Sequence, residues 1–215
     1  RPERAIADDE PVPPKVEAAV DKALAWLAHG QLSDGSWRQG HGSSTAVPSV
    51  AVMAFLARGH VPGQGPYGEV INRGIDYVLK VQKDDGMLSA GNGNAAMYEH
   101  GISTAMLSEA YGMVDDARKQ RIERALAKSV ALILAAQRVR KDNNEAGGWR
   151  YQRSSNDSDI SVTGWQLMGL RGAANCGASV PKDALAGGRE YVRRCAYQGR
   201  GGGFTYQARR GEPSP

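Results

Sequence analysis

Apolar residues recur every three or four positions in four stretches of the chain, and charged residues occupy the opposite face of each stretch. This spacing predicts four amphipathic surface helices. Their apolar positions are Val16, Val20, Ala23, Leu24 and Leu27; Ile71, Ile75, Val78 and Leu79; Ile122, Leu126, Val130, Ile133 and Leu134; and Tyr191, Val192 and Cys195. Three intervening segments, 47–57, 102–114 and 160–174, carry far fewer charges, which is typical of helices enclosed by others. Because no segment alternates with a period of two, the pattern predicts an all-α protein of about seven helices.

A short motif comes after each of the four amphipathic stretches. It consists of a glutamine, then one or two glycines, then a large side chain. Its four copies are Gln31, Gly35 and Trp37; Gln82, Gly86 and Met87; Gln137, Gly148 and Trp149; and Gln198, Gly203 and Phe204. Such repetition predicts an array of helical hairpins, each of which buries its apolar face against its neighbours. A glutamine amide can satisfy backbone groups at a helix end, and the aromatic ring can cover the next hairpin.

A register of 59 residues relates the starts of the three predicted inner helices. Two sets share it: His41, His100 and Asp159, and, four residues later, Thr45, Thr104 and Thr163. Equivalent positions of a repeat lie at one end of the array. One interpretation is therefore a pocket in which two imidazoles and a carboxylate bind a polar head group or a metal, although nothing in the sequence fixes metal–ligand distances. Thr104, Thr163 and Trp165 would be further ligand-binding residues. The other is that each residue caps its own helix, which gives the same register.

The repeated glutamine–glycine–tryptophan pattern with paired helices resembles the repeat of the squalene cyclase, oxidosqualene cyclase and protein prenyltransferase superfamily. The resemblance covers nearly all of residues 15–206. It implies an α/α toroid, partial or complete, in which inner helices surround a central cavity. Hydrocarbon cyclases of this family start their reaction with an Asp-x-Asp-Asp motif whose middle aspartate donates a proton. Here the matching residues are Asp157 and Asp159, the proposed catalytic pair, but Ile160 replaces the last aspartate.

The incomplete acid motif leaves two hypotheses about function. Carbocation chemistry needs aromatic faces along the cavity, and the inner segments offer only Phe55, Tyr111 and Trp165, with Tyr98 just ahead of one of them. This favours a non-catalytic module that binds an isoprenoid, another apolar small molecule or a peptide. The alternative is an active terpenoid cyclase with Asp159 as proton donor. The prenyltransferase zinc motif Asp-x-Cys is absent, so zinc-dependent thioether formation is not expected. We expect no bound metal and no cofactor.

Composition and charge narrow the range of partners. The 215 residues are 41% hydrophobic and 23% charged, and no apolar run approaches the length of a membrane span. The formal net charge is +4, and residues 189–210 carry six arginines against Glu190 alone. This basic edge suits an acidic partner. One glycine–arginine stretch at 199–204 is too little to predict nucleic-acid binding.

The chain divides by composition into a proline-rich arm at 1–14, a repeat domain at 15–207 and a C-terminal edge at 208–215. Cys176 and Cys195 are expected as reduced thiols, although a bridge between them stays open. The first residue is Arg1, so the sequence leaves the compartment, and any removed export signal, undecided.

Overall fold

The computed structural model describes residues 12–38, 43–91, 95–197 and 202–208, and these contain seven α-helices and no β-strand. The helices are α1 (Pro14–His29), α2 (Ala46–Ala57), α3 (Gly68–Lys80), α4 (Ala96–Ala110), α5 (Asp116–Gln137), α6 (Ile160–Asn175) and α7 (Lys182–Arg194). The predicted all-α class and the number of helices are therefore confirmed. Within the described ranges no helix is both long enough and apolar enough to cross a membrane.

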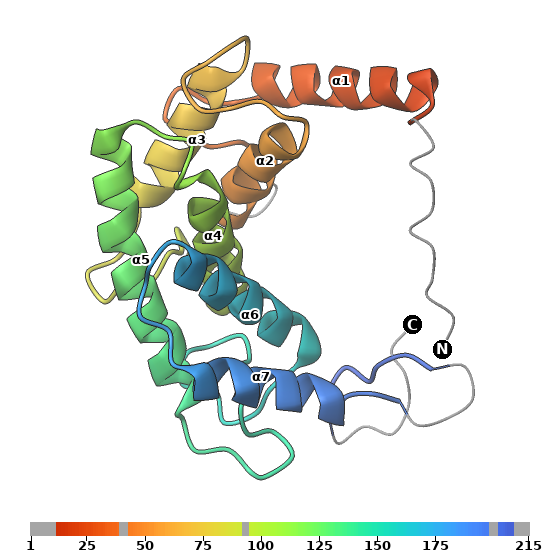
Figure 1. Cartoon of the computed structure of the whole chain (residues 1–215), viewed down its shortest axis with the longest axis vertical. Coiled ribbons are helices and arrows are strands. Elements are labelled where there is room, and N and C mark those ends of the chain that lie inside the picture. The colour runs from red at the N-terminus through yellow and green to blue at the C-terminus, as the bar shows by residue number, and fades with distance from the viewer. Residues whose placement is uncertain (1–11, 39–42, 92–94, 198–201, 209–215) are drawn as a thin grey trace.

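Helices α2, α4 and α6 form an inner row, and α3, α5 and α7 cover it from the outside (Figure 1). The closest pairing in the row is between α4 and α6, where small residues let the backbones approach. A Cβ atom on Gly101 would lie 2.5 Å from Nε2 of Gln166, and one on Gly172 would lie 2.7 Å from Cβ of Ser108. Any larger side chain at these two glycines would force α4 and α6 apart.

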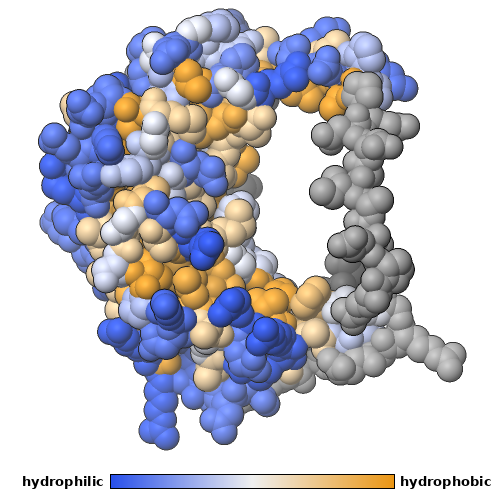
Figure 2. Space-filling view, viewed as in Figure 1, coloured by the Kyte–Doolittle hydropathy of each residue, from blue (hydrophilic) through white to orange (hydrophobic). Residues whose placement is uncertain are grey.

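The described helices form an open arc around a recess (Figures 1 and 2). Helix α1 extends from one end of this arc (Figure 1), and its Glu17 and Asp21 pair with Arg58, the C-cap residue of α2, at 3.6 and 3.1 Å. Leu24 is its buried residue, whereas Val16 and Val20 are about two-fifths exposed (42% and 39%). The structure thus shows an arc of helical hairpins, and closure into a ring stays a prediction.

The three motif glutamines that the structure describes make the same pair of hydrogen bonds. Gln31 Nε2 donates to the carbonyl of Gly35, at 3.2 Å, and to the carbonyl of Val70 in the next outer helix, at 2.9 Å. The corresponding bonds run from Gln82 to Gly86 and Ala125, at 3.0 and 3.1 Å, and from Gln137 to Gly147 and Ala184, at 2.8 and 2.9 Å. Each glutamine therefore ties its turn to the following hairpin. Gln198, the fourth glutamine, lies outside the described residues.

The turn glycine fixes the register of the motif. Gly35, Gly86 and Gly147 all have positive φ angles, of 92°, 92° and 85°. A Cβ atom there would lie within 2.8 Å of a backbone carbonyl oxygen in the next outer helix, so these positions require glycine for two reasons. Counting from this glycine places Leu88, and not Met87, at the position of Trp37 and Trp149. This corrects the register read from the sequence.

Both tryptophans of the motif make an equivalent hydrogen bond. Trp37 Nε1 donates to the carbonyl of Leu27 at 2.7 Å, and Trp149 Nε1 donates to that of Ile133 at 2.8 Å. Each acceptor lies four residues before the motif glutamine, and both rings are buried. The rings therefore close their own hairpins, a structural role that needs no ligand.

Candidate functional site

Two residues of the 59-residue register, His100 and Asp159, do not occupy equivalent places. His41 lies outside the described residues. Asp159 is the N-cap of α6, whereas His100 is the fifth residue of α4. Hydrogen bonds to the motif turns show which residues of the two repeats are equivalent. Nδ1 of His100 accepts from the backbone N–H of Leu88 at 3.0 Å. In the next repeat, Oγ1 of Thr163 accepts from the backbone N–H of Trp149, also at 3.0 Å. The counterpart of His100 is therefore Thr163.

His100 is fully enclosed and fully hydrogen-bonded. Its Nε2 donates to the carbonyl of Ser129 in α5 at 3.2 Å, and Nδ1 is occupied by Leu88. Burial lowers the pKa of the imidazole to about 4, so the ring is neutral at pH 7. Thr104, one turn later, donates to the carbonyl of His100 at 2.7 Å and is buried as well. His100, Thr104 and Thr163 thus support packing and present no free polar atom to the recess. The pocket itself stays a prediction, because His41 is not among the described residues.

Asp159 caps helix α6 from a fully buried position. Its Oδ1 accepts from the backbone N–H of Val162 at 2.8 Å and from Oγ of Ser161 at 2.7 Å. A carboxylate at this place satisfies free N–H groups and complements the helix dipole. Its second oxygen, Oδ2, lies 3.5 Å from Nη1 of Arg150 and accepts no hydrogen bond.

Arg150 pairs with both aspartates of the incomplete acid motif. Its Nε lies 3.3 Å from Oδ2 of Asp157, and its Nη1 faces Asp159. The guanidinium also packs over two aromatic rings, at 4.5 Å from the centroid of Tyr151 and 5.4 Å from that of Tyr206. One cation thus joins two carboxylates and two rings.

A third tyrosine completes the group. Tyr98 stacks on Tyr151 with ring centroids 5.9 Å apart, and its hydroxyl is hydrogen-bonded to Ser161, the residue that also donates to Asp159. The hydroxyls of Tyr151 and Tyr206 are hydrogen-bonded to each other. Burial raises the pKa of both Tyr98 and Tyr206, so these phenols are neutral. We call the set Tyr98, Arg150, Tyr151, Asp157, Asp159 and Tyr206 the tyrosine–arginine cluster.

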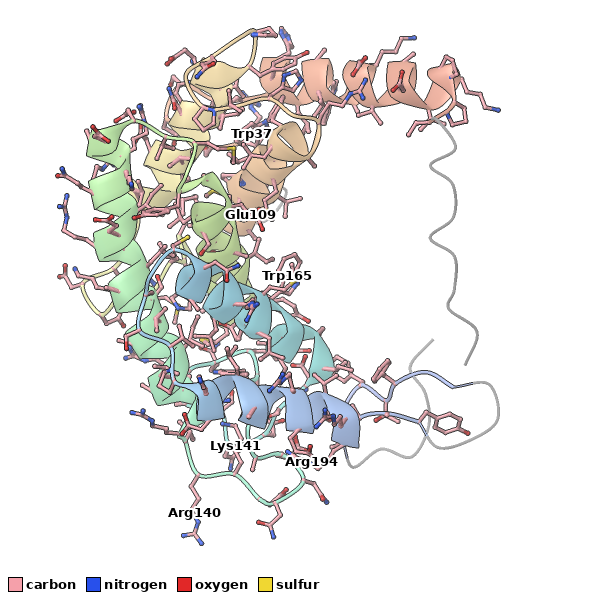
Figure 3. The ribbon with its side chains drawn as sticks, in the orientation of Figure 1. Trp37, Glu109, Arg140, Lys141, Trp165 and Arg194 are labelled. Carbon is pink, nitrogen blue, oxygen red and sulfur yellow. The ribbon has the colours of Figure 1, made fainter. Side chains whose placement is uncertain are left out.

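Trp165 lies one helical turn beyond Ser161 on α6, and its side chain points into the recess (Figure 3). The ring is partly exposed. Exposed apolar side chains accompany it on the inner helices, among them Val50 of α2 (49% exposed) and Met168 of α6 (55% exposed). Trp165 is therefore the predicted ligand-binding residue that the structure places at the recess.

The other aromatic candidates lie elsewhere. Phe55 is fully buried against Tyr67, with ring centroids 5.0 Å apart. Tyr111 donates a 2.5 Å hydrogen bond to Glu123 of the outer helix α5. Neither belongs to the tyrosine–arginine cluster.

Sequence reasoning missed the importance of Arg150, Tyr151 and Tyr206. A signal was present, because the third and fourth motifs read Gly-Gly-Trp-Arg-Tyr and Gly-Gly-Phe-Thr-Tyr. The tyrosine two residues after the large ring recurs, and in the structure these two tyrosines meet. The sequence did not reveal that Arg150 would turn toward the two aspartates.

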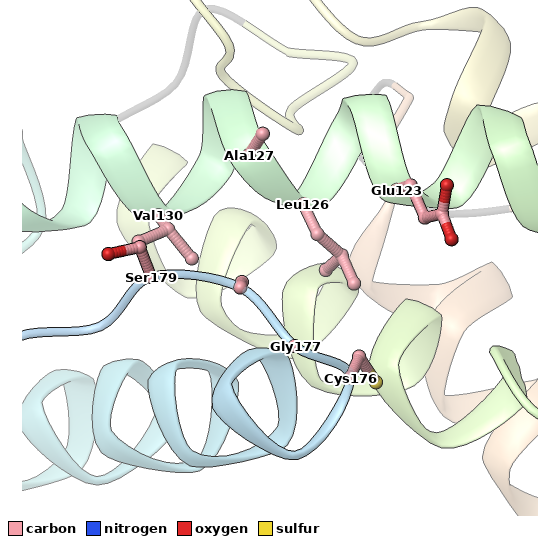
Figure 4. Close-up of a pocket in the computed structure, with 8 residues that line it drawn as sticks. Glu123, Leu126, Ala127, Val130, Cys176, Gly177 and Ser179 are labelled. Atoms are coloured by element: carbon pink, nitrogen blue, oxygen red, sulfur yellow. The ribbon is translucent and has the colours of Figure 1, made fainter.

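A separate groove of about 430 Å³ lies between α5 and residues 176–179 (Figure 4). Leu126, Val130 and Cys176 line it, and Cys176 donates through Sγ to the carbonyl of Ser108 at 3.3 Å. Burial raises the pKa of this thiol, which disfavours a reactive thiolate. Cys176 and Cys195 are both free cysteines. Within the described ranges, no three His, Cys, Asp or Glu side chains are grouped so that they could hold a metal ion.

Comparison with protein-family models finds no match for this chain, and comparison with curated proteins finds none either. The function is therefore inferred from the geometry of the site.

Proposed function

We propose that the chain is a binding module built from squalene cyclase/prenyltransferase-like repeats, and that its recess holds a partner polypeptide. Trp165 and the rings of the tyrosine–arginine cluster would contact apolar side chains of that partner. The observation that carries this proposal is the place of Arg150, whose guanidinium lies between two aspartates and over two tyrosine rings. The cluster is thereby held in a fixed arrangement before any ligand arrives, which lowers the entropic cost of binding.

The same arrangement argues against carbocation chemistry in the cluster. A cyclase uses aromatic faces to stabilise the cation of its substrate. Here the faces of Tyr151 and Tyr206 already pack against the protein's own cation. Oδ1 of Asp159 is already used as the cap of α6, where it accepts from the backbone N–H of Val162 and from Oγ of Ser161.

The shape of the recess favours a polypeptide over a small apolar molecule. Small-molecule sites enclose most of their ligand, whereas the described helices form an arc with the recess on its concave side (Figures 1 and 2). Concave faces of helical repeat proteins are extended binding surfaces. Tyrosine and tryptophan, the residues present here, are also the side chains that most often dominate binding between proteins.

The test is a selection of short random peptides displayed on phage, followed by measurement of affinity for the selected peptide. Trp165→Ala should weaken binding by about thirtyfold, since central tryptophans commonly contribute about 2 kcal/mol or more. Trp26→Ala is the matched control, because Trp26 is 73% exposed on α1 and lies outside the cluster. Equal affinities of the two variants, or no selectable peptide, would reject the proposal.

Active cyclisation is the second candidate, and one observation favours it: Oδ2 of Asp159 is buried and accepts no hydrogen bond. Incubation of the wild-type chain with squalene, followed by gas chromatography of the extract, separates the two functions. A cyclic product that disappears in Asp159→Asn would establish the cyclase. Absence of product, together with peptide binding, supports the binding module.

A further inference from the structure

The face formed by α6 and α7 on the side away from α4 is not covered by another helix of the described chain. Earlier in the array, the inner helix α6 packs against the preceding inner helix α4 and outer helix α5. A further helix placed on α6 and α7 would pack against them in the same way. The face carries a groove of about 620 Å³, which is lined by Leu167, Arg171, Lys182, Leu185 and Arg189.

The lining residues follow helical spacing on both walls. Leu167 and Arg171 are four residues apart on α6, whereas Lys182, Leu185 and Arg189 share one face of α7. The two leucines are partly buried, and the three cationic residues are exposed. Figure 2 shows apolar surface between α6 and α7 with hydrophilic side chains on both sides.

None of the three cations has an anionic partner in the described part of the chain. Arg171, Lys182 and Arg189 take part in no ion pair or side-chain hydrogen bond there. Neighbouring arginines of α7 differ, because Arg193 pairs with Glu190 at 3.4 Å and Arg194 Nε donates to the carbonyl of Asn144 at 3.1 Å. Three uncompensated positive charges therefore surround an apolar floor.

We infer that this groove binds an acidic amphipathic α-helix of a partner protein. The leucines would receive the apolar ridge of that helix, in the helix-in-groove mode of recognition. Acidic residues beside the ridge would pair with Arg171, Lys182 and Arg189, which selects against a basic or neutral helix. This surface lies apart from the tyrosine–arginine cluster and does not depend on the function proposed for the recess.

The test measures fluorescence anisotropy with a labelled helical peptide of about 18 residues, with leucines at intervals of three and four and glutamates beside them. The wild-type chain should bind it, and binding should weaken as salt rises from about 0.05 to 0.5 M. The double variant Arg171→Glu/Arg189→Glu should bind about tenfold more weakly or worse. The same peptide with lysines in place of the glutamates should not bind.

Arg138→Glu/Arg140→Glu is the matched control, because both residues are exposed and Arg140 points away from the body (Figure 3). It should keep the affinity of the wild type, and circular dichroism should show native helix content for both double variants. Loss of affinity in both double variants alike, or equal affinity for the glutamate and lysine peptides, would overturn the inference. Self-association that Arg171→Glu/Arg189→Glu abolishes would also overturn it, since the occupant would then be a second copy.

Discussion

His100 in α4 and Asp159 at the start of α6 are both fully buried polar residues, but their side chains have different kinds of partner. His100 is neutral, and each of its ring nitrogens has one backbone partner. Asp159 faces an arginine and leaves one carboxylate oxygen without a hydrogen bond. The His100 arrangement is part of the packed interior. The Asp159 arrangement instead faces Arg150, whose guanidinium packs over the rings of Tyr151 and Tyr206.

The difference lies in the residues directly after the two turns. Leu88 occupies the place of Trp149, and the next residue is Ser89, so no arginine stands there. After Trp149 come Arg150 and Tyr151, which supply the cation and the ring. The cation and the ring that follow Trp149 therefore have no counterpart after Leu88, where Ser89 and Ala90 stand.

The largest effect is expected from Asp159→Ala. The variant removes the cap of α6 and leaves the largely buried Arg150 with only Asp157, so it should lower the free energy of unfolding by about 3–5 kcal/mol. Urea denaturation measures this change. Asp115→Ala is the control, because Asp115 caps α5 by accepting from Arg118 N–H at 3.0 Å but is exposed. It should cost about 1 kcal/mol. Equal losses would show that the Arg150 pair contributes nothing.

The pH dependence of stability tests the neutral state of His100. Its pKa of about 4 in the folded chain lies below the ordinary value of 6.5, so between these values the unfolded chain binds a proton that the folded chain does not. The free energy of unfolding should therefore fall as pH falls from 6.5 to about 4. The part due to His100 is about 3 kcal/mol.

Comparison with His100→Gln, which cannot titrate, isolates this contribution. The variant should be less stable at pH 7 and should lose less stability on acidification. His29→Gln, a change at an exposed histidine, should keep the wild-type slope. An unchanged slope in His100→Gln would contradict the neutral, buried assignment.

The sequence predicted the fold better than the site. Periodicity found the four amphipathic helices because an amphipathic face is a local property of its segment, and scarcity of charge found the three inner ones. The glutamine motif marked the described turns after α1, α3 and α5. The 59-residue register failed because the true counterparts His100 and Thr163 are 63 residues apart. The spacing from Leu88 to Trp149 is 61 residues, and the segment from Trp149 to Thr163 is two residues longer than that from Leu88 to His100. Register in space depends on loop length, which a fixed sequence spacing ignores.

The roles of Asp157 and Asp159 could be predicted only in part. Capping is expected from an Asp-Ser-Asp run before a helix, and the structure shows Asp159 in that role. The pairing of these aspartates with Arg150 could not be inferred from the sequence. Arg150 reaches them because residues 149–159 fold back on themselves, with the N–H of Asp159 donating to the carbonyl of Trp149 at 2.9 Å. Tyr206 comes from a turn more than 40 residues further along the chain.

The smallest effect is expected from the paired hydroxyls of Tyr151 and Tyr206. Tyr151→Phe and Tyr206→Phe each remove one partner of the same hydrogen bond, so each should cost about 1 kcal/mol in unfolding free energy. The double variant should cost no more than about the same amount, because the two changes act on one bond. Fully additive losses would mean that the two hydroxyls are independent.

The central claim is that the aromatic surface beside Arg150, with Trp165 at its centre, binds a partner. The most direct measurement is the affinity of a peptide selected on the wild-type chain for Trp165→Ala and for Trp26→Ala, with unfolding curves recorded for both. We predict about thirtyfold weaker binding for Trp165→Ala alone. Retention of full affinity by Trp165→Ala would contradict the claim.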